Sequence, residues 1–210
     1  MKNPIIGLHG NPRVGKGTLA GLLVGLDGFA CIGFADRLYE EVARAFGVTV
    51  AQLQQDDWKS TPQPALALYH CMDDCFYNLM YTVYAEDAQA PRTSRWILQR
   101  WGTEYRRAQN PRYWINIVEQ FVQDHEKQPV VLHDVRFEDE AKLGLLLVLR
   151  RQRSGQGIIE ITRKNAPPPD AHTSNRRLPD HLIDFTVAND GTPEEMYQAV
   201  INEMGSKWKS

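Results

Sequence analysis

The segment Gly10–Thr18, which reads GNPRVGKGT, constrains the fold of this chain more than any other part of the sequence. It follows an apolar run at 5–8, and it precedes leucines at helical spacing that begin at Leu19. A glycine-rich turn between a strand and a helix is what a phosphate-binding loop requires. Backbone N–H groups and the helix N-terminus would carry partial positive charge there, and Lys16 would place a full charge at the β- and γ-phosphates. The segment predicts a nucleoside triphosphate site, against the weaker alternative of a glycine-rich turn that contains a lysine by chance.

The residue after the lysine narrows the class of loop. Most such loops carry Ser or Thr at that position as a magnesium ligand, whereas this chain has Gly17 there and Thr18 one position later. The ending Gly-Lys-Gly-Thr resembles the nucleoside monophosphate kinases, in which magnesium is held by water and by acidic residues elsewhere. It differs from the loop of the switch GTPases.

Composition limits the domain count and the partners. A chain of 210 residues with 42% hydrophobic residues suits one α/β domain with room for a small lid or insertion. The formal net charge of -2 provides no global field for nucleic acid polymers or membranes, and no apolar run has the length of a membrane span. The three cysteines, an odd number, and the absence of a signal peptide predict a reducing, cytoplasmic location. Cys71 and Cys75 are one helical turn apart, but a second ligand pair at zinc spacing is missing, so we interpret them as packed helix residues.

The basic residues are segregated along the chain. Residues 92–112 contain six arginines and a single acid, Glu104, and a second basic stretch covers 150–177. Two arginine-rich stretches and a lysine loop suit a protein that binds two phosphorylated ligands. The alternative is that these arginines form solvated helix faces.

Hydrophobic patterns predict the secondary structure. Apolar runs indicate five strands, at 5–8, 29–34, 130–134, 157–162 and 185–188. Helical periodicity indicates helices that begin near 36, 65, 93, 110 and 192, with a long continuous one at 65–84, and the polar residues 50–64 indicate a loop or insertion. Strands interleaved with helices predict an α/β fold with a doubly wound, five-stranded parallel sheet.

Acidic residues follow two of the predicted strands. Asp36 comes after the second strand, where it either caps the next helix or faces the ligand crevice, and both roles are compatible. Asp134 ends the third strand in the Walker B pattern, which would place its carboxylate at the magnesium or at a water bound to it. Arg136 could reach the phosphates from the same strand end. The acids Asp139 and Glu140 lie in the first turn of the following helix, as the helix dipole favours.

The polar segment 163–180 contains a run of three prolines and reads as a surface loop, which in a kinase is where a mobile lid would lie. Thr192 and Glu195 form a capping-box pattern with Pro193 at the first helical position, so turn chemistry alone explains this motif.

Taken together, these motifs resemble the deoxynucleoside monophosphate kinases of tailed bacteriophages over nearly the whole chain. The motifs that carry the resemblance are the phosphate loop, Phe34–Asp36, Leu98–Glu104, Tyr113–Trp114, Asp134–Arg136, Asp170–His172 and Asn189–Thr192. The resemblance implies transfer of the γ-phosphoryl group of ATP to a deoxynucleoside 5′-monophosphate, with Mg²⁺ as cofactor. It implies one P-loop kinase domain over 1–210, with a core at 1–49 and 128–210, a helical acceptor-binding region at 50–127 and a small lid at 163–180.

The resemblance also implies residue roles. The ATP-binding residues would be Gly10, Arg13, Val14, Gly15, Lys16, Gly17, Thr18, Asn189 and Gly191. The acceptor-binding residues would be Asp36, Arg37, Arg95, Gln99, Gly102, Thr103, Trp114, Arg136, Asp139 and Glu140. The catalytic residues would be Lys16, Arg136 and Arg163, and Asp134 would hold Mg²⁺ directly or through water. The expected partners are small nucleotides, without nucleic acid polymers or membranes, in the host cytoplasm if a phage encodes the chain, and a homodimer is one expected state.

The chain departs from the family pattern at one position, and its motifs also leave two alternative functions open. Relatives often have Pro-Leu-Lys where this chain has Arg37-Leu38-Tyr39, so Arg37 is the candidate substitute for the lysine. Dephospho-coenzyme A kinase shares the expected fold, although the Leu98–Glu104 block and Trp114 fit it poorly. An ATP-dependent regulator without an acceptor is the binding-protein alternative.

Overall fold

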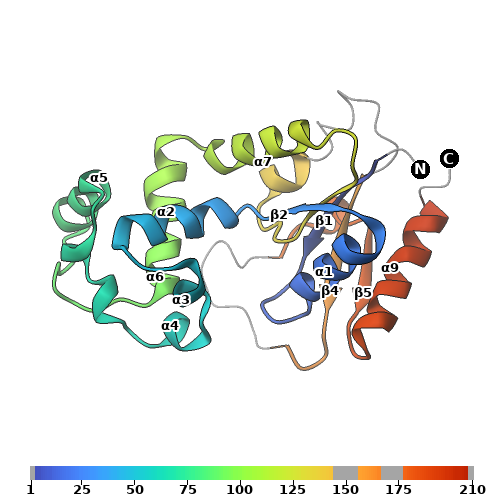
Figure 1. The fold of residues 1–210 in the computed structure, drawn as a ribbon, viewed down its shortest axis with the longest axis horizontal. Helices are drawn as coiled ribbons and strands as arrows, with labels where there is room; N and C mark the ends of the chain where they lie inside the picture. Colours follow the sequence, from blue (N-terminus) through green and yellow to red (C-terminus); the bar gives the residue numbers. More distant parts are fainter. Residues whose placement is uncertain (1–2, 144–155, 167–176, 208–210) are drawn as a thin grey trace. The chain divides into compact units, whose positions relative to one another are not determined.

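The computed structural model of this chain describes residues 3–143, 156–166 and 177–207 (Figure 1). It divides into two compact units. The first unit comprises 1–34 and 115–210, and the second comprises 35–114.

The first unit is built on a parallel sheet. Its strands are β1 (Ile5–His9), β2 (Ala30–Ile32), β3 (Val130–Leu132), β4 (Gln156–Thr162) and β5 (Phe185–Ala188). The strand order is β2-β3-β1-β4-β5, and every pairing is parallel. The predicted doubly wound α/β fold with five parallel strands is therefore confirmed. After β1 the chain runs to one edge of the sheet, and after β4 it runs to the other edge. Parallel α/β sheets bind ligands where the direction of winding reverses in this way, so a ligand crevice is expected at the carboxyl end of the central strand β1.

Helices cover both faces of this sheet. Helices α1 (Lys16–Asp27) and α9 (Pro193–Lys207) lie side by side and share one core with alternate residues of the strands, such as Ile6 and Ile159 (Figure 1). The intervening strand residues, such as Ile5, point to the opposite face and are also buried. Helix α7 (Tyr113–Asp124) and the helical residues 138–143 also bury apolar side chains. These side chains are not part of the core that α1 and α9 share with the sheet. Burial on both faces explains why the inner strands β1 and β3 are nearly continuous apolar runs.

The second unit is helical. Its α-helices are α2 (Asp36–Phe46), α3 (Val50–Gln54), α4 (Asp56–Ser60), α5 (Asp74–Asn78) and α6 (Ser94–Gln99). It also contains the 3-10 turns η1 (Pro64–Leu66) and η2 (Leu68–His70), and the π-helical segments η3 (Leu79–Val83) and η4 (Arg100–Arg107). A small core holds the unit together, and its fully buried side chains include Leu53, Leu66, Leu68, Phe76, Met80, Ile97 and Trp101. In the first unit, η6 (Asp180–Leu182) precedes β5.

The predicted continuous helix at 65–84 is wrong. The backbone is extended at Ala67 and at Cys71, and the helical path resumes only after Asp73, whose side chain caps α5 through the Phe76 N–H group. Without a continuous helix there is no single apolar face. Met72, which lies between η2 and α5, is 67% exposed.

Three other boundaries differ from the sequence prediction. The expected loop at 50–64 contains α3 and α4, because Thr49 and Gln52 form a reciprocal capping box that starts α3. The second strand, predicted at 29–34, is shorter, and so is the third. The helix predicted at 93–107 is confirmed as α6 and η4, although its second half is π-helical.

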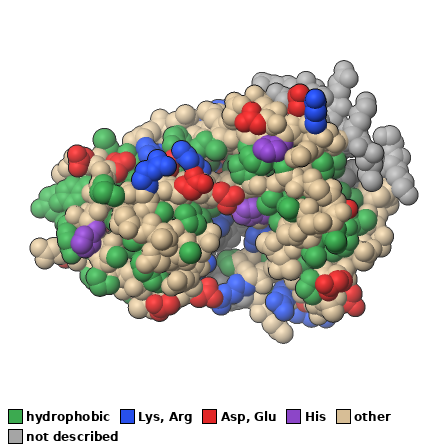
Figure 2. Space-filling model, viewed as in Figure 1, with side chains coloured by type: hydrophobic (Ala, Val, Ile, Leu, Met, Phe, Trp, Pro, Cys, Tyr) green, Lys and Arg blue, Asp and Glu red, His purple; other side chains and the backbone are tan. Residues whose placement is uncertain are grey.

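Large hydrophobic side chains are exposed in the second unit near α5, where Figure 2 shows hydrophobic atoms gathered over this end of the unit. They include Tyr69, Met72, Tyr81, Val83 and Tyr84. The three cysteines are free thiols, and Cys31 and Cys75 are exposed. Among the described residues, no helix is long and apolar enough to cross a membrane.

Two glycines of α1 provide a matched test of the helix. Gly25 is exposed, and no heavy atom of the described residues would crowd a Cβ built there. Gly25→Ala should raise the melting temperature by about 1–4 °C, because alanine stabilises an exposed helix position by ~0.5–1 kcal/mol. Gly28 is equally uncrowded but caps the helix at a φ of 69°, where a Cβ is strained. Gly28→Ala should therefore lower the melting temperature. Thermal unfolding followed by circular dichroism measures both variants, and a shift of the two melting temperatures in the same direction would contradict this prediction.

Candidate phosphate-binding site

The loop after β1 has a curled backbone that explains its glycines. Gly10 has a φ of 136°, and a Cβ there would lie 2.2 Å from the carbonyl oxygen of Ile161 on β4. Arg13 adopts a φ of 65° and Gly15 a φ of 103°. Successive residues in right-handed and left-handed conformations turn their N–H groups inward and form an anion-binding concavity. This is the geometry of a phosphate-binding loop.

Asn189 holds this loop from the end of β5. Its side-chain amide donates to the carbonyl oxygen of Val14 over 2.8 Å, and its backbone N–H donates to Thr162 over 2.8 Å. A Cβ on Gly15 would lie 2.4 Å from the Asn189 amide nitrogen. The predicted ATP-binding residues Val14, Gly15 and Asn189 are thus brought together, with the Asn189 side chain on the loop backbone itself.

The start of α1 is open to an anion. Gly15 is its N-cap residue and has no side chain with which to cap the helix. The first N–H groups of a helix have no partner inside it, and they carry the positive end of the helix dipole. Gly17 and Thr18 are exposed in this first turn. A phosphate group fits such a site without any further donor.

The ammonium group of Lys16 lies against the loop. Its Nζ donates to the carbonyl oxygens of Gly10 and Asn11 over 2.7 and 2.9 Å. Burial, followed by the positive charge of Arg136, lowers the pKa of Lys16 to about 8, while Asp134 opposes this shift. A lysine held in this way shields the loop carbonyls and has a charge that is easily lost above neutral pH.

Asp134 lies in the turn that follows β3, the strand next to central β1. It is buried, and its Oδ1 accepts the backbone N–H of Phe34 over 2.5 Å. Among the described residues there is no group of three or more His, Cys, Asp or Glu side chains that could hold a metal ion. A single carboxylate beside a phosphate loop fits Mg²⁺, which prefers one or two carboxylates together with phosphate oxygens and water.

The turn after Asp134 is fastened by Glu140. This carboxylate is buried and accepts the backbone N–H groups of Arg136 and Phe137 over 2.8 and 3.1 Å. Asp139 accepts the N–H group of Glu140 over 3.0 Å. Glu140, expected from the resemblance to touch the acceptor, therefore caps the turn from which the exposed Arg136 extends.

The remaining predicted residues of the first unit lie on two turns. Arg163 directly follows β4 and is exposed, and Lys164 beside it donates its backbone N–H to Asp190 over 3.0 Å. Gly191 precedes the reciprocal capping box of Thr192 and Glu195, which is confirmed. The predicted lid at 163–180 lies largely outside the described residues.

The other predicted residues belong to the second unit. Asp36 is the first residue of α2 and Ala35 is the N-cap, so the interpretation of Asp36 as the cap is wrong. Arg37 is exposed and donates to Glu40 over 2.7 Å. Arg95 is exposed on α6, where Gln99 is half-buried, and Thr103 is half-buried on η4.

Trp114 and Gly102 are in direct contact. The indole N–H donates to the Gly102 carbonyl oxygen over 3.1 Å, and both residues are buried. A Cβ on Gly102 would lie 3.3 Å from Leu38, so this position is tight for any larger residue.

At least three of the six arginines in 92–112 form ion pairs, and three of their acidic partners, Glu41, Asp73 and Glu86, lie outside that segment. Arg92 pairs with Glu86, Arg100 with Glu104 and Arg106 with Glu41 and Asp73. Arg100 is half-buried, and its guanidinium also lies over the rings of Trp96 and Tyr84.

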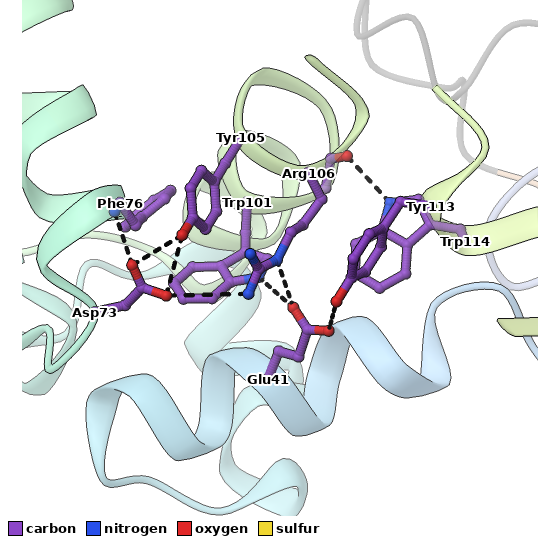
Figure 3. A network of polar contacts seen from close by, with 9 residues as sticks. Glu41, Asp73, Phe76, Trp101, Tyr105, Arg106, Tyr113 and Trp114 are labelled. Atoms are coloured by element: carbon purple, nitrogen blue, oxygen red, sulfur yellow. Dashed lines mark hydrogen bonds and ion pairs between the residues drawn. The ribbon is translucent and has the colours of Figure 1, made fainter. Parts of the chain in front are cut away.

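Glu41 is the centre of a buried network that sequence analysis missed (Figure 3). Its carboxylate accepts from Trp101, Arg106 and Tyr113 over 2.9, 2.8 and 2.6 Å. The Tyr113 pKa is raised, first by burial and then by this bond. The network joins α2, η4 and the start of α7 beside the Gly102–Trp114 contact, and a buried carboxylate needs such donors. The sole sequence signal was an acid on a helix face otherwise rich in apolar residues.

Comparison with known proteins gives similarity to solved structures and no family. No protein-family model matches the chain, and no curated protein matches it. Among solved structures, it is similar to an APS kinase of Mycobacterium tuberculosis, with a TM-score of 0.44, 11% sequence identity and 97% of each chain covered. A similarity at this level carries no argument about function. The fold is that of an α/β domain with a five-stranded parallel sheet, and the curled loop after β1 is its candidate phosphate-binding site.

The pKa of Lys16 predicts how triphosphate binding depends on pH. The charged ammonium binds phosphate, so binding must take up a proton once the free protein has lost it above pH 8. The dissociation constant of a fluorescent ATP analogue should be constant below pH 7.5 and rise by up to about tenfold per pH unit well above 8. Lys16→Arg is the control, because a guanidinium stays charged and should give a weaker but flat profile. A flat wild-type profile up to pH 9.5 would contradict this role of Lys16.

Proposed function

We propose that this chain is a kinase that transfers the γ-phosphoryl group of ATP to a deoxynucleoside 5′-monophosphate, giving the diphosphate and ADP. The observation that carries the proposal is the arrangement of charge at the curled loop, where the Lys16 ammonium lies against the loop carbonyl oxygens and is acted on by the charges of Arg136 and Asp134. Two cations and one carboxylate beside an anion-binding loop suit the transfer of a phosphoryl group, which needs positioning and charge neutralisation more than a strong base.

The residues of the first unit would act on ATP. The loop N–H groups and the start of α1 would bind the β- and γ-phosphates, and Lys16 would exchange its loop carbonyl partners for phosphate oxygens. Arg136 would neutralise charge on the transferring group, and Arg163 would assist. Asp134 would hold Mg²⁺, which when bound bridges phosphate oxygens and withdraws charge from them.

The deoxynucleotide acceptor is supported by the resemblance carried by the Leu98–Glu104 block. In the second unit Arg95 and Gln99 lie four positions apart on α6, hence on one face of a helix. Gly102 is kept small by Leu38 and is bonded to Trp114, and a small residue beside an aromatic ring suits a nucleotide. Arg95 would bind the acceptor phosphate, and Arg37 would take the place of the family lysine.

The proposal is tested by ADP release from ATP and Mg²⁺ with a panel of acceptors. Release should depend on the acceptor and be fastest with one or more deoxynucleoside monophosphates. Release stimulated by dephospho-coenzyme A alone would identify the small-molecule kinase instead. Tight ATP binding with no release in any mixture would identify a regulator.

Within this assay, Arg95→Ala should raise the KM for the deoxynucleotide about 10- to 150-fold, because a charge-assisted bond to phosphate contributes ~1.5–3 kcal/mol. The KM for ATP should stay within about twofold. Arg95→Lys should recover part of the loss, since an ammonium cannot replace the bidentate guanidinium. Arg44→Ala, which removes an exposed arginine from the last turn of α2, is the control. A change in the KM for ATP alone would move Arg95 out of the acceptor site.

Asp134→Asn tests the metal role with little effect on the fold. Asparagine keeps a carbonyl oxygen that can accept the Phe34 N–H, so the melting temperature should change by no more than about 2 °C. The Mg²⁺ concentration that half-saturates both turnover and binding of the fluorescent ATP analogue should rise about 10- to 100-fold. Asp124→Asn at the exposed end of α7 is the matched control. Magnesium titrations that overlay the wild type would leave Asp134 with a structural role alone.

A further inference from the structure

His9 is a buried titratable residue that the proposed reaction does not use. It is the last residue of β1, directly before the first glycine of the phosphate loop, and it is 6% exposed. Its Nδ1 lies 2.9 Å from the carbonyl oxygen of Val135, and its Nε2 accepts the backbone N–H of Leu178 over 3.2 Å. One imidazole therefore contacts two segments more than 120 residues away in the sequence.

The two partners determine the proton on this ring. A carbonyl oxygen can only accept, so Nδ1 must carry a hydrogen, and a backbone N–H can only donate, so Nε2 must be bare. Both bonds exist together only in the neutral Nδ1–H tautomer. A second proton on Nε2 would bring two N–H groups face to face and break the contact with Leu178.

Both partners lie next to charged residues, and those beside Val135 belong to the candidate site. Val135 stands between Asp134 and Arg136, so a bond to its carbonyl oxygen restrains the backbone from which both side chains extend. Leu178 follows Arg177, which forms two hydrogen bonds to Glu160 on β4. Glu160 is itself buried and also accepts from Thr186 over 3.1 Å.

We propose that His9, as the neutral Nδ1–H tautomer, is a positioning residue that fastens the Asp134–Arg136 turn and the Leu178 backbone to the strand that carries the phosphate loop. This inference rests on the proposed function for its effect on turnover, but the hydrogen bonds themselves can be tested without any reaction. His9 would contact no nucleotide and would act through the backbone of Val135 and Leu178.

The charged groups that act on His9 favour the neutral ring on balance. Burial lowers its pKa below the ordinary value of 6.5, and Lys16 and Arg177 lower it further, while the Val135 bond and Glu160 oppose this. Because the folded-state pKa is depressed, the contribution of His9 to stability is complete above pH 6.5. It is lost as the pH falls through the folded-state pKa.

Two measurements on the wild-type protein test the contacts directly. The ¹⁵N chemical shifts of His9 at pH 7 should show a protonated Nδ1 and a bare Nε2. The Leu178 amide should be protected from hydrogen exchange at pH 7 and should lose protection as the ring is protonated at lower pH. An Nε2–H tautomer, an imidazolium at pH 7 or an unprotected Leu178 amide would overturn the proposal.

Two substitutions separate the two bonds. The side-chain NH₂ of asparagine can take the position of Nδ1, so His9→Asn should keep the bond to the Val135 carbonyl oxygen. The side-chain carbonyl oxygen of glutamine can take the position of Nε2, so His9→Gln should keep the bond from the Leu178 N–H group. His9→Asn should speed exchange at Leu178 about fivefold, the effect of a bond worth ~1 kcal/mol, with kcat within about twofold of wild type. His9→Gln should keep the Leu178 protection and lower kcat about fivefold, with the KM for ATP within about twofold.

Equal losses of protection and of turnover in both variants would show that His9 acts through packing alone and would overturn the proposal. His9→Phe, which keeps an aromatic ring without either bond, should show both defects at once. If no acceptor in the panel supports turnover, the proposed function fails. The tautomer and the exchange rates then still decide whether His9 holds its two partners.

Discussion

The close approach of two neighbouring strands to the phosphate loop is the contact on which the site depends. The carbonyl oxygen of Ile161 on β4 lies so close to Gly10 that only a hydrogen fits there. The side chain of Asn189, which follows β5, excludes a Cβ at Gly15 in the same way. The loop backbone is thus held in its curled form from the side, before any ligand arrives. A preorganised set of N–H groups costs little to align when a phosphate binds, which is why such loops bind anions strongly.

Charge in the first unit is arranged around that loop. Lys16 is partly buried against the carbonyls of Gly10 and Asn11, and the positive charge of Arg136 acts with burial to lower its pKa. Asp134 is the nearby carboxylate that opposes this effect. An incoming triphosphate would relieve the repulsion between the two cations and restore full charge to the lysine.

The second unit uses charge for its own structure. Glu41 lies among Trp101, Arg106 and Tyr113, which together satisfy a carboxylate that would otherwise be costly to bury (Figure 3). The same contacts orient η4, where the predicted acceptor residue Gly102 lies. The arginines of 92–112 were expected to bind ligands, but several of them form ion pairs within the protein. Arg95, in contrast, lies on the surface.

The sequence by itself determined the parallel sheet, the phosphate loop and the capping box at Thr192, because apolar runs, glycine spacing and helix caps are encoded by residues close together in the chain. Only the tertiary structure decided that Asn189 holds the loop, that Glu140 caps the turn before it, and that His9 lies between the Val135 carbonyl oxygen and the Leu178 N–H group. It also replaced the expected helix at 65–84 with short turns. The partners in the long-range contacts lie up to 175 positions apart, and no local pattern records which distant carbonyl or N–H group a polar side chain will meet.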